Sequence, residues 1–512
     1  MNPALHSLTL GEILEEHRRA RPQQLAVVGE GRRLTYPALA DRVQQLANAL
    51  EDAGVRRGDR VLWLAQNHPG VLEGIIACGQ LGAMFCPVNW RQTADELAFV
   101  IDDLEPHLVV WQEAEIGDAV RAARDKAMDR RARWLPLDGP GGWDEFIASR
   151  TPEQRRRTPC MDDAVLVVYT AAFGGRPNGA MLSQRAIAWQ DLALIDIQDL
   201  GSDTRFLNSG PLFHVGTLMV MLAVFHIGGC NVFIRRSDTE AIARLIHEER
   251  CSYAFLMQST CAELAALNRD RRYDFSCLRS ASVSPEWDAM VQVQDARNLF
   301  GYGQTEVMGP VAWSYYGWGQ NIGRNGRSGP VAQLRILDDE GCELPPGEVG
   351  EICVRGPTVM NGYWRRPELN GQRQRGGWHR SNDLGRREAD GSLTFIGPKL
   401  QMIKSGAENI YPAEVEGCLR QHPAVADAGV IGVPDATWVQ SVKAIVVLKA
   451  GAEVSEQALI EHCRARIASY KKPRQVVFAG ALPRNSQGAV DYAALDAAHG
   501  GGGYPGGATR GA

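Results

Sequence analysis

The first part of the chain alternates between helix-like and strand-like hydrophobic patterns. From Tyr36 the apolar residues recur every three or four positions until Gly54, which predicts an amphipathic helix that ends at a glycine. A buried strand, a second helix and another short strand are predicted to follow over 60–64, 69–82 and 84–88. Alternation of this kind is typical of a mainly parallel sheet, so the large N-terminal region is predicted to be α/β.

The pattern changes twice further along the chain. Short β-rich runs interrupted by Gly and Pro over 342–364 predict a β subdomain. After residue 398 a smaller α+β unit is predicted, with helices from 412 and over 455–469 and strands over 425–433, over 442–448 and near 476. We therefore expect an N-terminal domain over 1–398 and a C-terminal domain over 399–495. The Gly-rich end over 496–512 has too few apolar residues to offset its ordering entropy and is expected to be disordered.

Composition narrows the class of protein and of partner. A chain of 512 residues is too long for one core, and 45% hydrophobic with 22% charged residues is ordinary for a globular protein. The net charge of −5 provides no basic field, so a small-molecule partner is expected and neither nucleic acid nor a membrane surface. The 11 cysteines form no CxxC pair, and no secretory signal or membrane-spanning run is apparent, which favours a reduced, cytoplasmic protein.

Motifs in a fixed order carry the candidate chemistry. They are PLFHV at 211–215, GYGQTE at 301–306, the Gly-rich segment 347–364, WHRSNDLG at 378–385 and KSGAENIYPAEVE at 404–416. In this order they resemble the adenylate-forming superfamily, which includes acyl-CoA synthetases, luciferases and nonribosomal peptide synthetase adenylation domains. The resemblance implies a large domain that binds AMP and the acyl group, and a small mobile C-terminal domain. It also implies two steps, in which a carboxylate and ATP form an acyl-adenylate and a thiol such as CoA then displaces AMP.

The residues that the family uses in the first step are largely missing. Its phosphate loop resembles Y-T-S-G-T-T-G-x-P-K-G, but 169–179 reads YTAAFGGRPNG, with Ala171, Phe173 and Asn178 in place of serine, threonine and lysine. The lysine of its C-terminal L-P-x-x-x-x-G-K pattern is Ala489. Losing one such preorganised charge typically lowers a rate by about 10² to 10³. Adenylation is therefore predicted to be defective.

Two cations leave an alternative open. Arg176 lies close to the missing loop lysine, and guanidinium binds phosphate well. In the hinge, where the family has G-R-x-K-D, this chain has GPKLQ at 397–401, and Lys399 lies one position from the expected lysine. A complete ATP-dependent synthetase that uses these substitutes thus stays an alternative.

Residues that the family uses to hold AMP are present. The resemblance implies that Tyr302 stacks on adenine, Thr305 contacts the α-phosphate and Asp383 accepts both ribose hydroxyls. Glu306 matches the magnesium-binding glutamate, and whether Mg²⁺ is needed without a pyrophosphate is left open. The candidate AMP-binding set is Tyr302, Gly303, Gln304, Thr305, Glu306 and Asp383.

Residues for the second step are also present. By resemblance, the segment 404–416 lines the tunnel for the pantetheine of CoA, with Ser405 and Ala407 as binding residues and Gly406 as a catalytic candidate beside His214. His214 matches the residue at the junction of tunnel and acyl pocket. We assign it to orienting the acyl group, because a thiol that attacks an acyl phosphate needs little beyond positioning. The acyl pocket is predicted to draw on Trp189, Phe213, Met219, Tyr253, Met257 and Met308.

The selective pattern of loss leads to a hypothesis about function. We expect a ligase that accepts a preformed acyl-adenylate from a separate adenylating enzyme and transfers the acyl group to CoA. The departures resemble those of non-adenylating acyl-CoA ligases in diterpenoid natural-product biosynthesis, which implies a bulky terpenoid acid. The alternatives are the ATP-dependent synthetase, a pseudoenzyme that senses AMP or acyl-CoA, and transfer to a carrier-protein phosphopantetheine. The sequence leaves the oligomeric state open.

Overall fold

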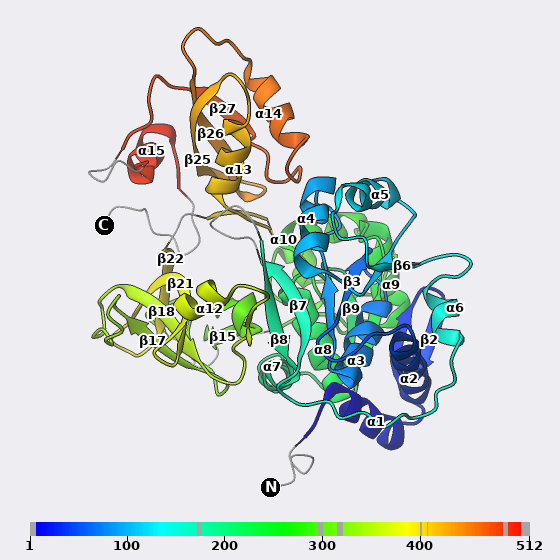
Figure 1. Cartoon of the computed structure of the whole chain (residues 1–512). Coiled ribbons are helices and arrows are strands. Elements are labelled where there is room, and N and C mark those ends of the chain that lie inside the picture. The colour runs from blue at the N-terminus through cyan, green and yellow to red at the C-terminus, as the bar shows by residue number, and fades with distance from the viewer. Residues whose placement is uncertain are drawn as a thin grey trace.

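The computed structural model places a large N-terminal domain, a β subdomain and a small C-terminal domain around one cleft (Figure 1). It describes residues 7–170, 177–294, 301–314, 321–399, 402–406, 408–484 and 490–502. The predicted α/β class with a small C-terminal α+β domain is confirmed. Among the described residues, no helix has the length and apolar character needed to cross a membrane.

A seven-stranded sheet forms the centre of the N-terminal domain, in the order β19-β8-β7-β4-β3-β5-β6. The strands are β3 (Arg60–Leu64), β4 (Met84–Pro87), β5 (Leu108–Trp111), β6 (Arg133–Pro136), β7 (Ala164–Thr170), β8 (Asn178–Ser183) and β19 (Gly362–Tyr363). The pairs from β7 through β4, β3 and β5 to β6 are parallel, as predicted. The helices α2 (Tyr36–Asp52), α3 (Gly70–Leu81), α4 (Ala94–Leu104), α5 (Gly117–Lys126) and α6 (Trp143–Ala148) connect or cover these strands.

Helix α3 packs closely against this sheet because it has a glycine at the point of contact. The helix is buried on nearly all sides. A Cβ at Gly74 would lie 2.2 Å from the ring of Phe85 on β4, so glycine allows the strand and helix to approach closely.

A second sheet completes the N-terminal domain, in the order β11-β9-β10-β1-β2. Its strands are β1 (Leu25–Gly29), β2 (Arg32–Thr35), β9 (Arg205–Asn208), β10 (Cys230–Phe233) and β11 (Tyr253–Ala254). The associated helices are α1 (Leu10–Ala20), α7 (Gln184–Ile197), α8 (Val215–Ile227), α9 (Thr239–Glu249), α10 (Gln258–Leu267) and α11 (Pro285–Asp288). Helices α3, α7 and α8 contribute to one core that both sheets share. This core fixes the start of α8, where His214 lies.

The β subdomain is larger than the segment from which it was predicted. Its main sheet has the order β17-β18-β21-β20, with β22 paired to β21. The elements are β17 (Gln333–Leu337), β18 (Gly350–Arg355), α12 (Pro367–Arg373), β20 (Gln374–Arg375), β21 (Trp378–Arg387) and β22 (Leu393–Pro398). The strands β14 (Gly301–Gln304), β15 (Gly309–Trp313) and β16 (Arg327–Ser328) form a smaller sheet beside it, and β12 (Arg279–Ser280) pairs with β13 (Gln292–Val293).

The C-terminal domain has its own sheet and core. Its elements are β23 (Ile403–Ser405), β24 (Glu408–Ile410), α13 (Pro412–Arg420), β25 (Val425–Asp435), β26 (Val439–Leu448), α14 (Glu456–Arg464), β27 (Gln475–Phe478) and α15 (Tyr492–His499). The helix predicted over 455–469 ends earlier, at Arg464. The tail predicted from 496 also begins too early, because α15 is capped by Asp491, buries Leu495 and continues to His499.

Candidate active site

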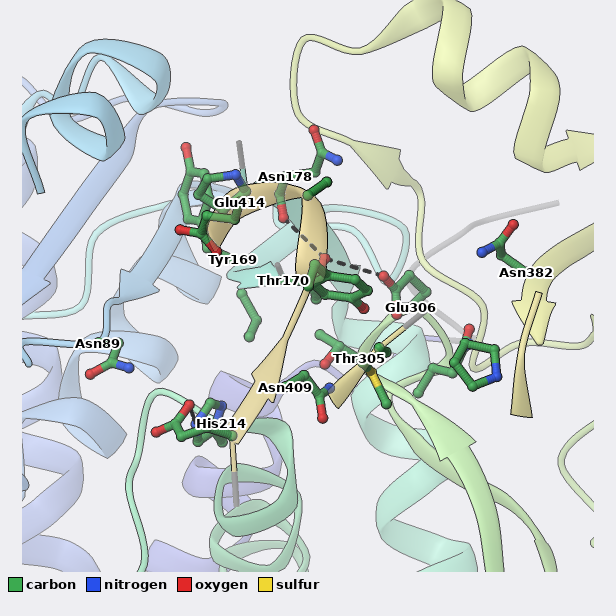
Figure 2. Close-up of a pocket in the computed structure, with 18 of the residues that line it drawn as sticks. Asn89, Tyr169, Thr170, Asn178, His214, Thr305, Glu306, Asn382, Asn409 and Glu414 are labelled. Atoms are coloured by element: carbon green, nitrogen blue, oxygen red, sulfur yellow. Dashed lines mark hydrogen bonds and ion pairs between the residues drawn. The ribbon is translucent and has the colours of Figure 1, made fainter. Parts of the chain in front are cut away.

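A cleft of about 1580 Å³ lies between the three parts of the molecule. Figure 2 shows residues that line it, with Thr305 and Glu306 drawn near Thr170, and with His214 on a separate part of the wall. The predicted residues that line this cleft are His214, Tyr302, Gly303, Gln304, Thr305, Glu306 and Asp383. Segments that are far apart in the sequence thus meet at one cavity.

Asp383 is the centre of the nucleotide-binding end. It lies on β21, and β14 brings two donors to its Oδ2 atom: the hydroxyl of Tyr302 at 3.0 Å and Nε2 of Gln304 at 2.6 Å. Burial raises the pKa of Asp383 to about 6, while these two hydrogen bonds act in the opposite direction. Among the described residues no donor reaches Oδ1, so this oxygen can accept hydrogen bonds from a ligand in the cleft.

Glu306 lines the cleft beside Thr170, the last residue of β7. Its Oε1 atom accepts hydrogen bonds from Thr170 Oγ1 at 3.3 Å and from the Tyr363 hydroxyl at 2.8 Å, and Figure 2 shows the first of these. No group of three His, Cys, Asp or Glu side chains in the described part of the chain could hold a metal ion. Glu306 alone fits Mg²⁺ only if phosphate oxygens complete the coordination, as is usual for this ion.

Asn178 occupies the position of the missing loop lysine, and its surroundings are neutral. Its Oδ1 atom accepts a hydrogen bond from Arg366 Nε at 3.0 Å. That guanidinium is itself paired with Asp103 at 2.7 Å, and Tyr169 donates to the second oxygen of the same carboxylate at 2.8 Å. The charge of Arg366 is therefore already balanced by Asp103.

The structure describes only some of the other positions at which the chain departs from the family's phosphate-binding residues. Ala171, Phe173, Arg176 and Ala489 lie outside the described residues, so the prediction about them stays a prediction. Lys399 is described, and its ammonium pairs with Asp339 at 2.6 Å and lies 3.6 Å from Glu351. Lys399 lines the cleft, and because both partners of its pair with Asp339 are exposed, that pairing is weak and leaves the alternative that uses Lys399 open.

The hairpin of β23 and β24 presents the C-terminal domain to the cleft. Lys404 and Glu408 line the cavity, whereas Ser405, the last residue of β23, and Gly406, which follows it, do not line it. Gly406 has φ +58°, in the left-handed region, and its amide donates to the carbonyl of Trp438 at 2.7 Å. Ala407 lies outside the described residues.

Glu408 joins the two domains beside His214. His214 Nε2 lies 3.2 Å from one oxygen of this carboxylate, and Arg91 Nη2 lies 3.3 Å from the other. Burial alone would raise the pKa of Glu408, but the hydrogen bond from His214 and the charges of His214 and Arg91 lower it overall. Sequence analysis did not single out Glu408, although it lies within the motif at 404–416.

Arg373 is a second residue that sequence analysis missed. It ends α12 and lines the cleft. Its guanidinium donates a long hydrogen bond of 3.5 Å to the carbonyl of Arg380, and it forms no ion pair with a carboxylate within the ranges that the structure describes. It lies near enough to Asp383 and Tyr411 to lower the pKa of each, against the larger effect of burial. No motif marks this position.

The predicted acyl-pocket residues separate into groups. Phe213 lines the cleft. Met219 and Met308 are buried in the core of the N-terminal domain, whereas Trp189 and Met257 are each more than 40% exposed. The last two therefore do not form part of a closed pocket within the described structure.

Comparisons with known proteins agree with this geometry. The model of AMP-binding enzymes matches residues 14–364, and the model of the AMP-binding enzyme C-terminal domain matches residues 414–489. The chain is 36% identical to the feruloyl-CoA synthase of Amycolatopsis sp over 485 residues, which are 92% of this chain and 96% of that protein. It is 34% identical to the indoleacetate–CoA ligase of Aromatoleum aromaticum over 502 residues, or 94% and 96% of the two chains.

A solved structure shows the same architecture. The amide bond synthetase McbA from Marinactinospora thermotolerans has a TM-score of 0.80 and 26% identity, with coverage of 96% of this chain and 100% of that one.

Proposed function

Because the chain belongs to the AMP-binding enzyme family and its relatives are acyl-CoA ligases, we propose that it transfers the acyl group of a preformed acyl-adenylate to CoA and releases AMP. The CoA sulfur attacks the acyl carbonyl carbon, and a carbon–sulfur bond forms. The bond from that carbon to the phosphate oxygen breaks, AMP leaves with the electron pair, and the thiol proton passes to water. This step consumes no ATP.

The contrast between the two ends of the cleft carries the proposal. At the nucleotide end, Tyr302 and Gln304 hold Asp383 with one oxygen directed to the ligand. At the phosphate end, Asn178 supplies no charge and Arg366 is balanced by Asp103. Expelling pyrophosphate requires cations that stabilise its developing charge, whereas expelling AMP from an acyl phosphate does not require a site for the β- and γ-phosphates.

The position of the C-terminal domain supports the acceptor half of the reaction. The β23–β24 hairpin, whose motif resembles the pantetheine-binding segment of the family, lies against His214 through Glu408. His214 then lies where acyl group and thiol would meet, and Glu408 holds its ring in one orientation. CoA and the AMP moiety of the adenylate are the ligands of the cleft in this proposal, and Ser405, Gly406 and Ala407 are the candidate contacts of pantetheine.

The acyl donor in this proposal is a bulky terpenoid acid that a separate enzyme has converted to its adenylate with ATP. The relatives named for feruloyl and indoleacetate groups also carry bulky acids, and the cleft of about 1580 Å³ is large enough for an extended ligand. The sequence resemblance alone favours the terpenoid class. A panel of acyl-adenylates of different acids would identify it.

One alternative has a specific observation in its favour. Curated relatives at 36% and 34% identity are named as a CoA synthase and a CoA ligase. This favours a complete ATP-dependent synthetase. The two proposals differ in one product, because only the synthetase releases pyrophosphate from acid and ATP.

The direct test supplies synthetic acyl-AMP and CoA to the purified protein without ATP and measures acyl-CoA and AMP by liquid chromatography and mass spectrometry. We expect both products in equal amounts. A protein that binds AMP or acyl-CoA but gives no turnover would instead be a sensor.

Arg373 provides a test of how the adenylate is held. If its guanidinium binds the phosphate, Arg373→Ala should weaken AMP binding by about 10- to 100-fold, whereas adenosine should bind the variant as well as the wild type. Isothermal titration with each ligand measures both affinities. Arg375→Ala is the matched control, because Arg375 is exposed on β20 and does not line the cleft. Equal losses for AMP and adenosine would remove Arg373 from the phosphate site.

A further inference from the structure

A buried lysine lies where the two domains meet, in the wall of the same cleft but with no role assigned in the reaction. Lys471 is 5% exposed, and its ammonium contacts two carboxylates: Glu96 Oε1 at 2.5 Å and Glu414 Oε1 at 2.7 Å. Glu96 belongs to α4 of the N-terminal domain and Glu414 to α13 of the C-terminal domain. Figure 1 shows α4 on the side of the N-terminal domain that faces the C-terminal domain. One cation thus connects two domains.

Contacts within the N-terminal domain orient the side chain of Glu96. It is the third helical residue of a capping box, and its Oε2 atom accepts hydrogen bonds from the backbone amide and the hydroxyl of Thr93 at 2.8 and 2.9 Å. Its other oxygen therefore points outward to a partner. That partner is Lys471.

The charges explain why the lysine is needed. Both carboxylate oxygens lie within 2.7 Å of the same nitrogen, so without the ammonium two acidic groups would face each other across the domain contact. Burial would lower the pKa of Lys471, but the interactions with Tyr470, Glu414 and Glu96 outweigh burial and raise the pKa overall. The ammonium stays charged at any physiological pH.

Two longer polar contacts join the same two segments of the N-terminal and C-terminal domains. Asn89 Nδ2 donates to the hydroxyl of Tyr470 at 3.4 Å, and the Thr93 hydroxyl oxygen lies 3.4 Å from the carbonyl oxygen of Arg466. We name the contact between 89–96 and 466–471 the seam. Lys471 and Glu96 line the same cleft as His214 and Glu408, and Arg91, within 89–96, pairs with Glu408. Lys471, Glu96 and Glu414 themselves take no part in the His214–Glu408 contact.

We propose that Lys471 is a positioning residue whose pairing with Glu96 holds the C-terminal domain in the orientation seen here, before any substrate binds. Such a resting state suits a protein whose first step has been lost, because it has no need to rotate the domain away for adenylation. This last argument rests on the proposed function, but the pairing itself does not.

Glu96→Gln is the cleanest variant for a test. Glutamine also completes a capping box, so α4 should remain folded, while the charge facing Lys471 is removed. Lys471→Met removes the ammonium and leaves the two carboxylates opposed. Asp95→Asn is the matched control, because Asp95 lies in the same helical turn but pairs with Lys126 on the surface.

Hydrogen–deuterium exchange on the full chain without substrates measures the seam directly. We expect peptides covering 89–96 and 466–471 to exchange about tenfold faster in Glu96→Gln and Lys471→Met than in the wild type or Asp95→Asn, since a weakened seam opens more often. We also expect kcat for acyl-AMP and CoA to fall about tenfold while the Kd for AMP stays within about twofold, because the nucleotide site belongs to the N-terminal side.

Unchanged exchange at the seam would overturn the proposal whatever the protein catalyses. Faster exchange with an unchanged kcat would show that the pairing does not position the domain for the reaction. A protein inactive in every form would refute the proposed function and leave the exchange result to decide on Lys471.

Discussion

Replacing Asp383 by alanine should lower kcat/KM for acyl-AMP and CoA by about 10²- to 10⁴-fold, because two charge-assisted hydrogen bonds to the ribose, each worth roughly 1.5 to 3 kcal/mol, would be lost. Tyr302 and Gln304 already direct one carboxylate oxygen, so the geometry for the ligand is preset. Steady-state kinetics with limiting acyl-AMP measure the effect. The Kd for AMP should rise in parallel.

Asp162→Ala is the control for this substitution. Asp162 pairs with Arg185 on the surface of the N-terminal domain and is 67% exposed, so its loss should leave kinetics and folding unchanged. Circular dichroism should show that Asp383→Ala stays folded. A folded Asp383→Ala variant with wild-type AMP affinity would rule out Asp383 as the ribose ligand.

Reversing the charge of Glu408 should have the second-largest effect. A lysine at 408 would place a cation between Arg91 and His214, where a carboxylate now pairs with both. Breaking a fully buried pair costs about 3 to 5 kcal/mol. Because Arg91 and His214 are 41% and 35% exposed, we expect the lower end of this range, or roughly a 100-fold loss in kcat/KM for CoA.

This substitution also separates the two halves of the site. The Kd for AMP should stay close to the wild-type value, because Glu408 belongs to the C-terminal domain and forms no hydrogen bond with Tyr302, Gln304 or Asp383. Glu461→Lys is the matched control, since this glutamate is 49% exposed on α14. Undiminished thioester formation by Glu408→Lys would mean that the contact between Glu408 and His214 is irrelevant to the reaction.

The sequence was most informative where short motifs carry both a local fold and a function. Tyr302 and Asp383 were predicted separately, 81 residues apart, and the structure places their side chains in contact. His214 was also predicted from its motif, and it lies at the N-terminal end of α8 and lines the same cleft. In these cases the residues that form the local structure are the same ones that build the site.

Contacts between distant single residues could not be predicted. Lys471 and Glu96 are 375 residues apart, and neither belongs to a motif that was singled out for function. Arg373 was likewise missed, because one arginine at the end of a helix has no signature. The helix expected over 455–469 ends at Arg464, and the following turn carries Tyr470 and Lys471 to the N-terminal domain. Hydrophobic periodicity alone contains no information about such a domain contact.

The central claim is that the adenylation step has been lost while the thiol step remains. Its most direct test is the ratio of two rates for the same purified protein: kcat/KM for acyl-AMP with CoA, and kcat/KM for the free acid with ATP and CoA. We predict a ratio above about 10², from the loss of at least one preorganised cation in the first step. A ratio near one, with pyrophosphate released from acid and ATP, would contradict the account.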